Sequence, residues 1–255
     1  MPYTQQIILA FYTGEGNEAI NSHAEKYQQK AETNKAITPV VKFMAEGLNS
    51  VGESETAKRH LKIALDSLKK PSSEVRTRLY ITGHGDYTKK TVGGRTADQV
   101  ATIVNSLQFE FDVISITACS AGRDQGTTDQ VTDTDGLKIC NPESRLSQPF
   151  NSFASDFHKI LKEKYNIKVI VYARVVDVAV DESDCSKYPS HMERISDTSN
   201  TNTGQAYPID KMKICFKWDA ETQKRDFIYT RHTKEPVNSN LDDDDSDDLP
   251  VFSKN

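Results

Sequence analysis

The sequence alternates short apolar runs with longer amphipathic stretches, and this alternation limits the fold more than any other feature. Apolar residues at helical spacing separate the first four runs, which predicts β–α–β units and a parallel sheet covered on both faces. The last two runs are joined only by the polar segment 219–224, so we expect them to form an antiparallel hairpin. The predicted strands are Gln6–Tyr12, Thr77–Thr82, Asp112–Thr117, Lys168–Ala173, Lys211–Trp218 and Arg225–Thr230. The predicted helices are Asn17–Thr33, Ser54–Leu68, a helix capped by Thr96 that runs through Leu107, and Phe150–Tyr165.

Charge divides the chain into a body and a tail. The segment 235–255 holds seven acidic residues and one lysine, with six aspartates between positions 242 and 248. Removing them from the totals of 37 acidic and 32 basic residues leaves 30 against 31, so the body is near neutral. We therefore predict one α/β domain over residues 1–234 and a disordered acidic tail over 235–255. The polar stretches 120–148 and 181–207 follow strand ends and receive no predicted element.

Composition excludes several classes of protein. No run approaches the eighteen consecutive apolar residues of a membrane span, and the N-terminus lacks the features of a signal peptide. The four cysteines form no CxxC pair, which argues against a zinc site and against a disulfide framework. The chain is thus expected in a reducing compartment, cytoplasmic as synthesised, without a metal. A near-neutral body also argues against nucleic-acid binding.

Two segments place reactive side chains directly after buried strands. In RLYITGHGD the strand runs into His84 and Gly85, and in DVISITACSAG it runs into Cys119. If the two strands are neighbours, His84 and Cys119 emerge at the same edge of the sheet, as a Cys–His pair requires. Small residues on both sides would leave the sulfur accessible.

These residue types suit acyl transfer. A thiolate attacks a carbonyl carbon, and an imidazole lowers the pKa of the thiol or protonates the leaving amine. The N–H groups of Gly85 and Cys119 would form an oxyanion hole. For a third, orienting residue the candidates are Glu15 and Asp86.

Two other interpretations use the same region. ACSAG also fits A-x-S-x-G, which would make Ser120 the nucleophile of an α/β hydrolase with His191 or His232 as base. That elbow needs a helix directly after the serine, whereas RDQGTTDQ has a loop composition. A non-catalytic binding module on the same fold is the other alternative.

The His-Gly and Ala-Cys segments resemble the signature of the caspase–gingipain–clostripain (clan CD) cysteine peptidases. Within that group the chain most resembles the self-processing cysteine protease domains of large bacterial toxins. The matching pieces are ITGHGD, GGRTADQVA, ISITACSAG, VIVYARVVDVAVDE and KMKICFKWDAETQKRDFIYT. The resemblance implies a caspase-like three-layer α/β/α sandwich with a C-terminal flap, and a Cys/His dyad that cleaves a protein substrate. It implies no required cofactor, but activation by inositol hexakisphosphate on a basic surface beside the flap.

The predicted hairpin has the charge that such an activator needs. Convergent cations bind polyphosphates, although lysines on an edge hairpin also protect it from pairing. The candidate activator-binding residues are Lys211, Lys213, Lys217, Lys224, Arg225 and Arg231. Toxin domains cut their own chains, whereas this sequence begins with Met and carries no cargo domain. We therefore expect cleavage in trans by a bacterial effector that enters a host cell without a cleavable signal peptide.

Overall fold

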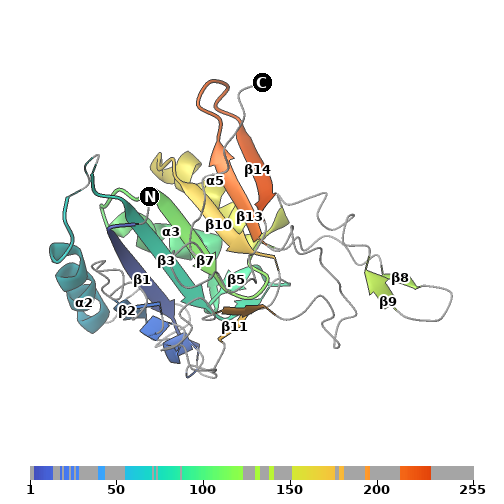
Figure 1. Cartoon of the computed structure of the whole chain (residues 1–255), viewed down its shortest axis with the longest axis horizontal. Coiled ribbons are helices and arrows are strands. Elements are labelled where there is room, and N and C mark those ends of the chain that lie inside the picture. The colour runs from blue at the N-terminus through green and yellow to red at the C-terminus, as the bar shows by residue number, and fades with distance from the viewer. Residues whose placement is uncertain are drawn as a thin grey trace, which may run out of the picture.

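A seven-stranded sheet forms the centre of the structure, a computed structural model (Figure 1). Its strand order is β14-β13-β10-β7-β3-β1-β2. The five strands from β2 to β10 pair in parallel, and β13 and β14 add to the β10 edge in antiparallel fashion. The strands are β1 (Gln5–Phe11), β2 (Val40–Phe43), β3 (Thr77–Gly83), β7 (Val113–Thr117), β10 (Ile170–Arg174), β13 (Lys213–Trp218) and β14 (Arg225–Thr230). The structure describes residues 3–13, 18, 20–22, 24–25, 27–28, 40–43, 55–70, 72, 74–86, 88–122, 130–132, 138–140, 151–175, 178–180, 193–195 and 213–230.

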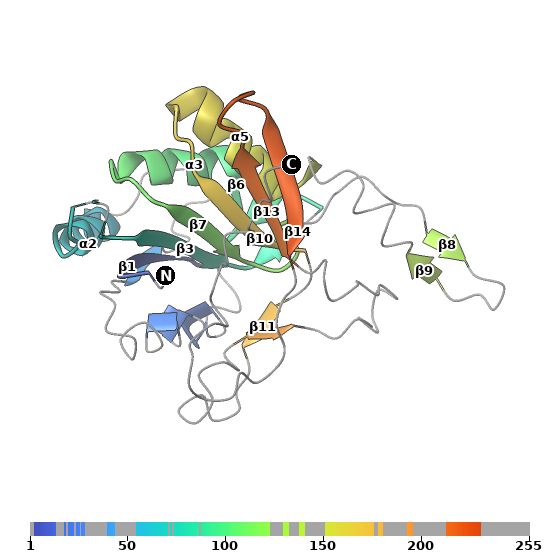
Figure 2. The ribbon, with the colours of Figure 1, turned by 45° about the horizontal axis from the view of Figure 1, so that its top comes forward.

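Helices cover both faces of the sheet, as the alternation in the sequence predicts. Three helices pack on one face: α2 (Glu55–Asp66), α3 (Ala97–Ser106) and α5 (Phe153–Tyr165). Alternate strand residues such as Leu9, Ile81 and Ile116 point into that core. Helical residues between positions 18 and 28 pack on the other face, where Ile20, Ala24 and Tyr27 contact Ile8, Ala10, Tyr12 and Tyr80. Figure 2 shows this blue segment across the sheet from α3 and α5.

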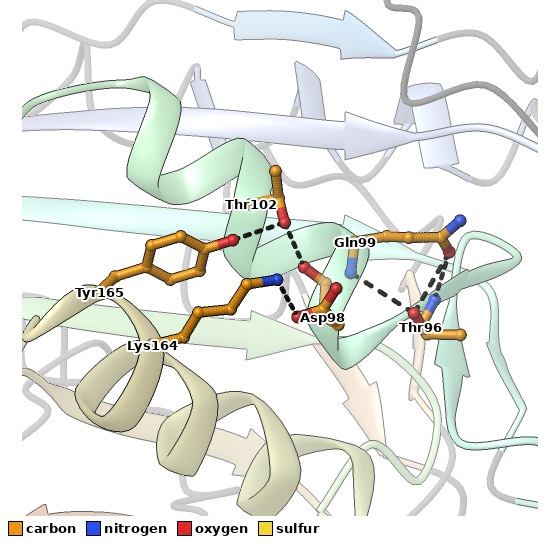
Figure 3. Close-up of polar contacts among 6 residues, drawn as sticks. All are labelled: Thr96, Asp98, Gln99, Thr102, Lys164 and Tyr165. Carbon is orange, nitrogen blue, oxygen red and sulfur yellow. Dashed lines mark hydrogen bonds and ion pairs between the residues drawn. The ribbon is translucent and has the colours of Figure 1, made fainter.

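Polar contacts join α3 to α5 along their exposed side (Figure 3). Lys164 Nζ lies 2.7 Å from Asp98 Oδ1, and the hydroxyls of Thr102 and Tyr165 are also 2.7 Å apart. At the start of α3 the Thr96 hydroxyl accepts from the Gln99 N–H, and the Gln99 side chain accepts from the Thr96 N–H. Thr96 is therefore the N-cap of α3, as predicted, and forms a capping box with Gln99.

The predicted strands and helices are present where the chain is described, and their ends coincide with the predicted ones or differ by up to three residues. Five further pairings were not predicted, because strands this short carry little periodic signal. They are the β4–β5–β6 ribbon (Gly85–Asp86, Thr91–Val92, Arg95–Thr96), β8–β9 (Gln130–Thr132, Lys138–Cys140), β11–β12 (Val178–Val180, Glu193–Ile195) and the addition of β2. The predicted acidic tail lies outside the described residues.

No helix within the described ranges is long and apolar enough to cross a membrane.

Candidate active site

His84 and Cys119 follow neighbouring parallel strands in matching register. Thr82 at the end of β3 pairs with Thr117 at the end of β7, and each candidate residue comes two positions later. Both side chains are partly exposed, whereas every residue of the two strands is buried. The carboxyl ends of two adjacent strands thus bring an imidazole and a thiol to the same edge of the sheet.

Gly85 follows His84 in the sequence, and its backbone lies against the backbone of Cys119. A Cβ atom at position 85 would lie 1.9 Å from the Cys119 carbonyl oxygen and 2.9 Å from its nitrogen. No side chain fits there, so glycine is required for the two segments to meet. The main-chain groups of Gly85 and Cys119 are therefore adjacent.

The chain turns sharply after β7, and backbone hydrogen bonds hold this turn on both sides. Ser120 has a φ of 53°, a left-handed conformation that is uncommon for a residue with a side chain. The Gly122 N–H donates to the Arg174 carbonyl at 2.7 Å, and the Ala154 N–H of α5 donates to the Ala121 carbonyl at 3.0 Å. The turn that carries Cys119 is thus tied to β10 and to the first turn of α5.

Ser120 does not suit the alternative role of nucleophile. Its exposed fraction is only 3%, and residues 118–122 form a turn, not the helix that the hydrolase elbow requires. The two histidines considered as its base, His191 and His232, lie outside the described residues.

His84 stands at the base of the small β4–β5–β6 ribbon. Gly85 pairs with Val92, and the Gly93 N–H donates to the His84 carbonyl at 2.7 Å. Gly93 has a φ of 56°, and a Cβ there would lie 2.3 Å from the Cβ of Phe11. The ribbon and the end of β1 therefore fix the backbone of His84.

Of the two proposed orienting residues, Asp86 is engaged in the turn of this ribbon. Its Oδ1 atom accepts from the Thr88 N–H at 3.0 Å, the Thr88 hydroxyl at 2.6 Å and the Lys89 N–H at 3.0 Å. The hydrogen bond from the Thr88 side chain is the main cause of the lowered pKa of Asp86. Asp86 is thus a turn-capping residue by its contacts, and Glu15 lies outside the described residues.

The candidate activator residues do not all lie together. Lys213 lies over the Tyr172 ring, 4.4 Å from its centroid, whereas Arg225 donates to the Ser155 carbonyl of α5 at 2.7 Å. Lys217 lies 3.9 Å from Asp226, and Lys224 is exposed in the connection between the strands. Lys211 and Arg231 lie outside the described residues.

Lys213 instead lines a pocket together with two arginines that sequence reasoning missed. Arg78 of β3 and Arg174 of β10 are each only 6% exposed, and Ser115 and Thr117 line the same pocket. The Arg78 guanidinium donates to Gln6 Oε1 and lies 5.1 Å from the centroid of the Tyr80 ring. The signal was an arginine at one end of a largely apolar strand segment, first in RLYITG and last in IVYAR, because arginine is rarely buried unless it is paired.

Comparison with known proteins gives a family match that includes both candidate residues. The model of the Peptidase C80 family matches residues 2–184, a range that contains His84, Cys119 and strands β1 to β10 and ends before the C-terminal hairpin. A search of curated proteins gave no match. The match spans well over half of the chain, and the chain therefore belongs to the Peptidase C80 family, the clan CD cysteine peptidases of bacterial toxin self-processing domains.

Proposed function

We propose that this cysteine peptidase hydrolyses a peptide bond in a protein substrate through a Cys119–His84 dyad. The observation that carries the proposal is the Thr82–Thr117 register, which sends both residues to one edge of the sheet. The contact between Gly85 and the Cys119 backbone supports it further, because it sets two main-chain segments beside the thiol.

In the proposed reaction the Cys119 thiolate attacks the carbonyl carbon of the scissile bond. The N–H groups of Gly85 and Cys119 stabilise the negative oxygen of the tetrahedral intermediate. The C–N bond then breaks, and His84 gives its proton to the leaving amine. Water, deprotonated by His84, hydrolyses the thioester and regenerates the thiol.

Neither alternative is favoured. The family assignment makes the chain a cysteine peptidase, and Ser120 is buried beside the more accessible Cys119. A binding module without activity has no observation in its support.

Iodoacetamide labelling followed by peptide mapping tests the dyad without knowledge of the substrate. We expect Cys119 to react at neutral pH faster than Cys215, which is 1% exposed, and His84→Ala to slow that reaction. Cleavage of a mixed-sequence peptide library should be lost in Cys119→Ser. Library cleavage at the wild-type rate by Cys119→Ser or by His84→Ala would refute the proposal.

Activation by an inositol polyphosphate is a second part of the proposal. Its support is the grouping of three cations, Arg78, Arg174 and Lys213, around one small opening whose described lining includes no carboxylate. Guanidinium groups bind phosphate through paired hydrogen bonds. The cluster draws on both the sheet and the hairpin, and we propose it as the activator site in preference to Lys224 and Arg225.

Titration with myo-inositol hexakisphosphate tests the pocket against the hairpin surface. We expect the compound to accelerate Cys119 labelling, and Arg174→Gln or Lys213→Gln to raise the concentration for half-maximal effect roughly tenfold or more. Lys224→Gln is the matched control and should respond as the wild type does. A weaker response in Lys224→Gln, with a wild-type response in Arg174→Gln and Lys213→Gln, would instead place the activator at the connection between β13 and β14.

The finer features of the fold and the biology complete the proposal. The arrangement of layers supports a caspase-like sandwich in which β13–β14 acts as a flap. Cleavage in trans is tested by mixing active enzyme with the tagged Cys119→Ser chain and with host-cell proteins. Delivery into a host cell stays a prediction, as does the role of the acidic tail.

A further inference from the structure

The ribbon that carries His84 is attached to α5 at the end remote from the histidine. Lys90 lies in the turn between β4 and β5, and its Nζ atom is 3.1 Å from Asp156 Oδ2 in the first turn of α5. The Lys90 side chain is 23% exposed and that of Asp156 is 40% exposed. The ion pair thus joins two elements that are 66 residues apart in the sequence.

Hydrogen bonds and strand pairing connect Lys90 back to His84 along the ribbon. Asp86 closes the turn by accepting from Thr88 and Lys89, and two residue pairs join β4 to β5. At the other end the Gly93 N–H holds the His84 carbonyl. Displacement of Lys90 would therefore shift the backbone at His84 as well.

The same turn of α5 also contacts the segment that carries Cys119. Ala154, two residues before Asp156, donates its N–H to the Ala121 carbonyl at 3.0 Å. Ser152 caps this turn by accepting from the Ser155 N–H at 3.2 Å. One capped turn of helix therefore contacts both the ribbon that follows His84 and the turn that carries Cys119.

A third element meets this turn from the C-terminal hairpin. Arg225 donates to the Ser155 carbonyl at 2.7 Å, next to Asp156 in sequence. Burial is the main cause of the lowered pKa of Arg225, and the negative charge of Asp156 opposes that shift. The Asp156 carboxylate therefore lies in the field of two cations, one from the His84 ribbon and one from the hairpin.

From these contacts we infer that Asp156 and Lys90 are positioning residues of the peptidase: their ion pair sets the place of His84 relative to Cys119. The inference rests on the proposed roles of those two residues. It does not need the pair to stabilise the fold, because partly exposed ion pairs contribute little to the free energy of folding. Its effect is on geometry: without the pair, conformations in which His84 is displaced from Cys119 become more populated, and the rate falls with the population of the active geometry.

The test compares Lys90→Met, Asp156→Asn and the double variant in the full chain. Two readouts are used: the pH profile of Cys119 alkylation by iodoacetamide, and kcat and KM for the peptide that the wild type cleaves best. We expect each single variant to lower kcat by up to about fivefold with KM nearly unchanged, because a pair worth up to about 1 kcal/mol shifts the population of the active geometry by that factor. The alkylation profile should move toward higher pH. The double variant should be no slower than either single one, since both remove the same restraint. Lys90→Arg should retain the wild-type rate.

Lys164→Met is the matched control, because Lys164 forms the Asp98 ion pair at the other end of α5 (Figure 3). It should leave both readouts unchanged. Wild-type kcat and alkylation in Lys90→Met, with His84→Ala and Cys119→Ser inactive, would overturn the inference and leave the proposed function standing. Wild-type alkylation of Cys119 in His84→Ala would overturn the proposed function and the inference with it.

Discussion

The backbone of Gly85 lies so close to that of Cys119 that a Cβ atom at position 85 would stand 1.9 Å from the Cys119 carbonyl oxygen. This contact joins the two segments that follow β3 and β7. It explains why a glycine comes directly after His84, since any side chain would push the histidine segment away from the cysteine turn. The main-chain contact therefore determines how closely these two segments approach each other.

Gly85→Ala should abolish peptide cleavage and slow the alkylation of Cys119 at neutral pH. The added methyl group meets backbone atoms, which yield less easily than a flexible side chain, so we also expect about 1–3 kcal/mol of lost stability. Gly83→Ala is the control, because a Cβ at that buried position would meet its nearest atoms at 3.1 Å. Its smaller clash should leave most of the activity. Equal activity of the two variants would contradict the proposed role of the Gly85 contact.

Thr117 and Tyr80 form a buried hydrogen bond on the sheet face opposite α3 and α5, and substitutions of the two residues should be energetically coupled. The Thr117 hydroxyl donates to the Tyr80 hydroxyl at 2.7 Å, and Thr117 lies two residues before Cys119. Thr117→Val or Tyr80→Phe alone should cost about 1–3 kcal/mol in the free energy of unfolding, because each leaves a polar group buried. The double variant should cost clearly less than the two single costs added together. Urea unfolding of the four proteins measures this coupling, and strict additivity would show that the bond is not the source of the cost.

The sequence predicted the sheet well because its strands and helices have strong periodicity. The runs that became β3 and β7 are mostly apolar at their centres and are buried along their whole length, as strands covered on both faces are. Their order along the chain also predicted that His84 and Cys119 would meet, given that the strands were neighbours. Whether two strands are neighbours depends on the topology of the sheet, and the pairing of Thr82 with Thr117 shows that β3 and β7 are adjacent.

The contacts that refine the site were not predictable by the same means. Asp86 was a candidate for orienting His84 because it is near in sequence, yet its carboxylate caps the next turn. Lys90 and Asp156 lie 66 residues apart and carry no motif, so only the packing of α5 against the ribbon brings them together. The cluster of Arg78, Arg174 and Lys213 was missed for a related reason: a charge count over the hairpin does not include cations on the neighbouring strands β3 and β10.

The role of Asp86 leads to a prediction that separates turn capping from catalysis. Asparagine keeps the Oδ1 acceptor, so Asp86→Asn should retain the turn and nearly all of the peptidase activity. Asp86→Ala removes the acceptor and should cost roughly 1 kcal/mol of stability together with part of the activity. Thermal unfolding and peptide cleavage, measured on both variants, test this. Loss of activity in Asp86→Asn with an unchanged Tm would instead make Asp86 the orienting residue of His84.

His158 should make the protein sensitive to acid without touching the proposed dyad. It is fully buried on α5, where its ring stacks on that of Trp218 at a centroid distance of 5.1 Å. Burial, aided by the nearby positive charge of Arg225, lowers the pKa of His158 to about 3. The unfolded chain takes up this proton as the pH falls through about 6.5, whereas the folded chain resists it down to about 3.

Stability should therefore fall as the pH drops from about 6.5 toward 3, by up to about 1.4 kcal/mol per pH unit from this residue alone. Above pH 7 both states hold His158 neutral, and its contribution no longer changes with pH. His158→Leu removes the titrating group, so its free energy of unfolding should decline less steeply between pH 6 and pH 4. Urea unfolding of both proteins across this range isolates the effect, because acidic residues contribute equally to the two curves. Parallel curves from pH 7 to pH 4 would mean that His158 takes up its proton as easily in the folded protein as in the unfolded chain, and that the junction between α5 and the hairpin opens in acid.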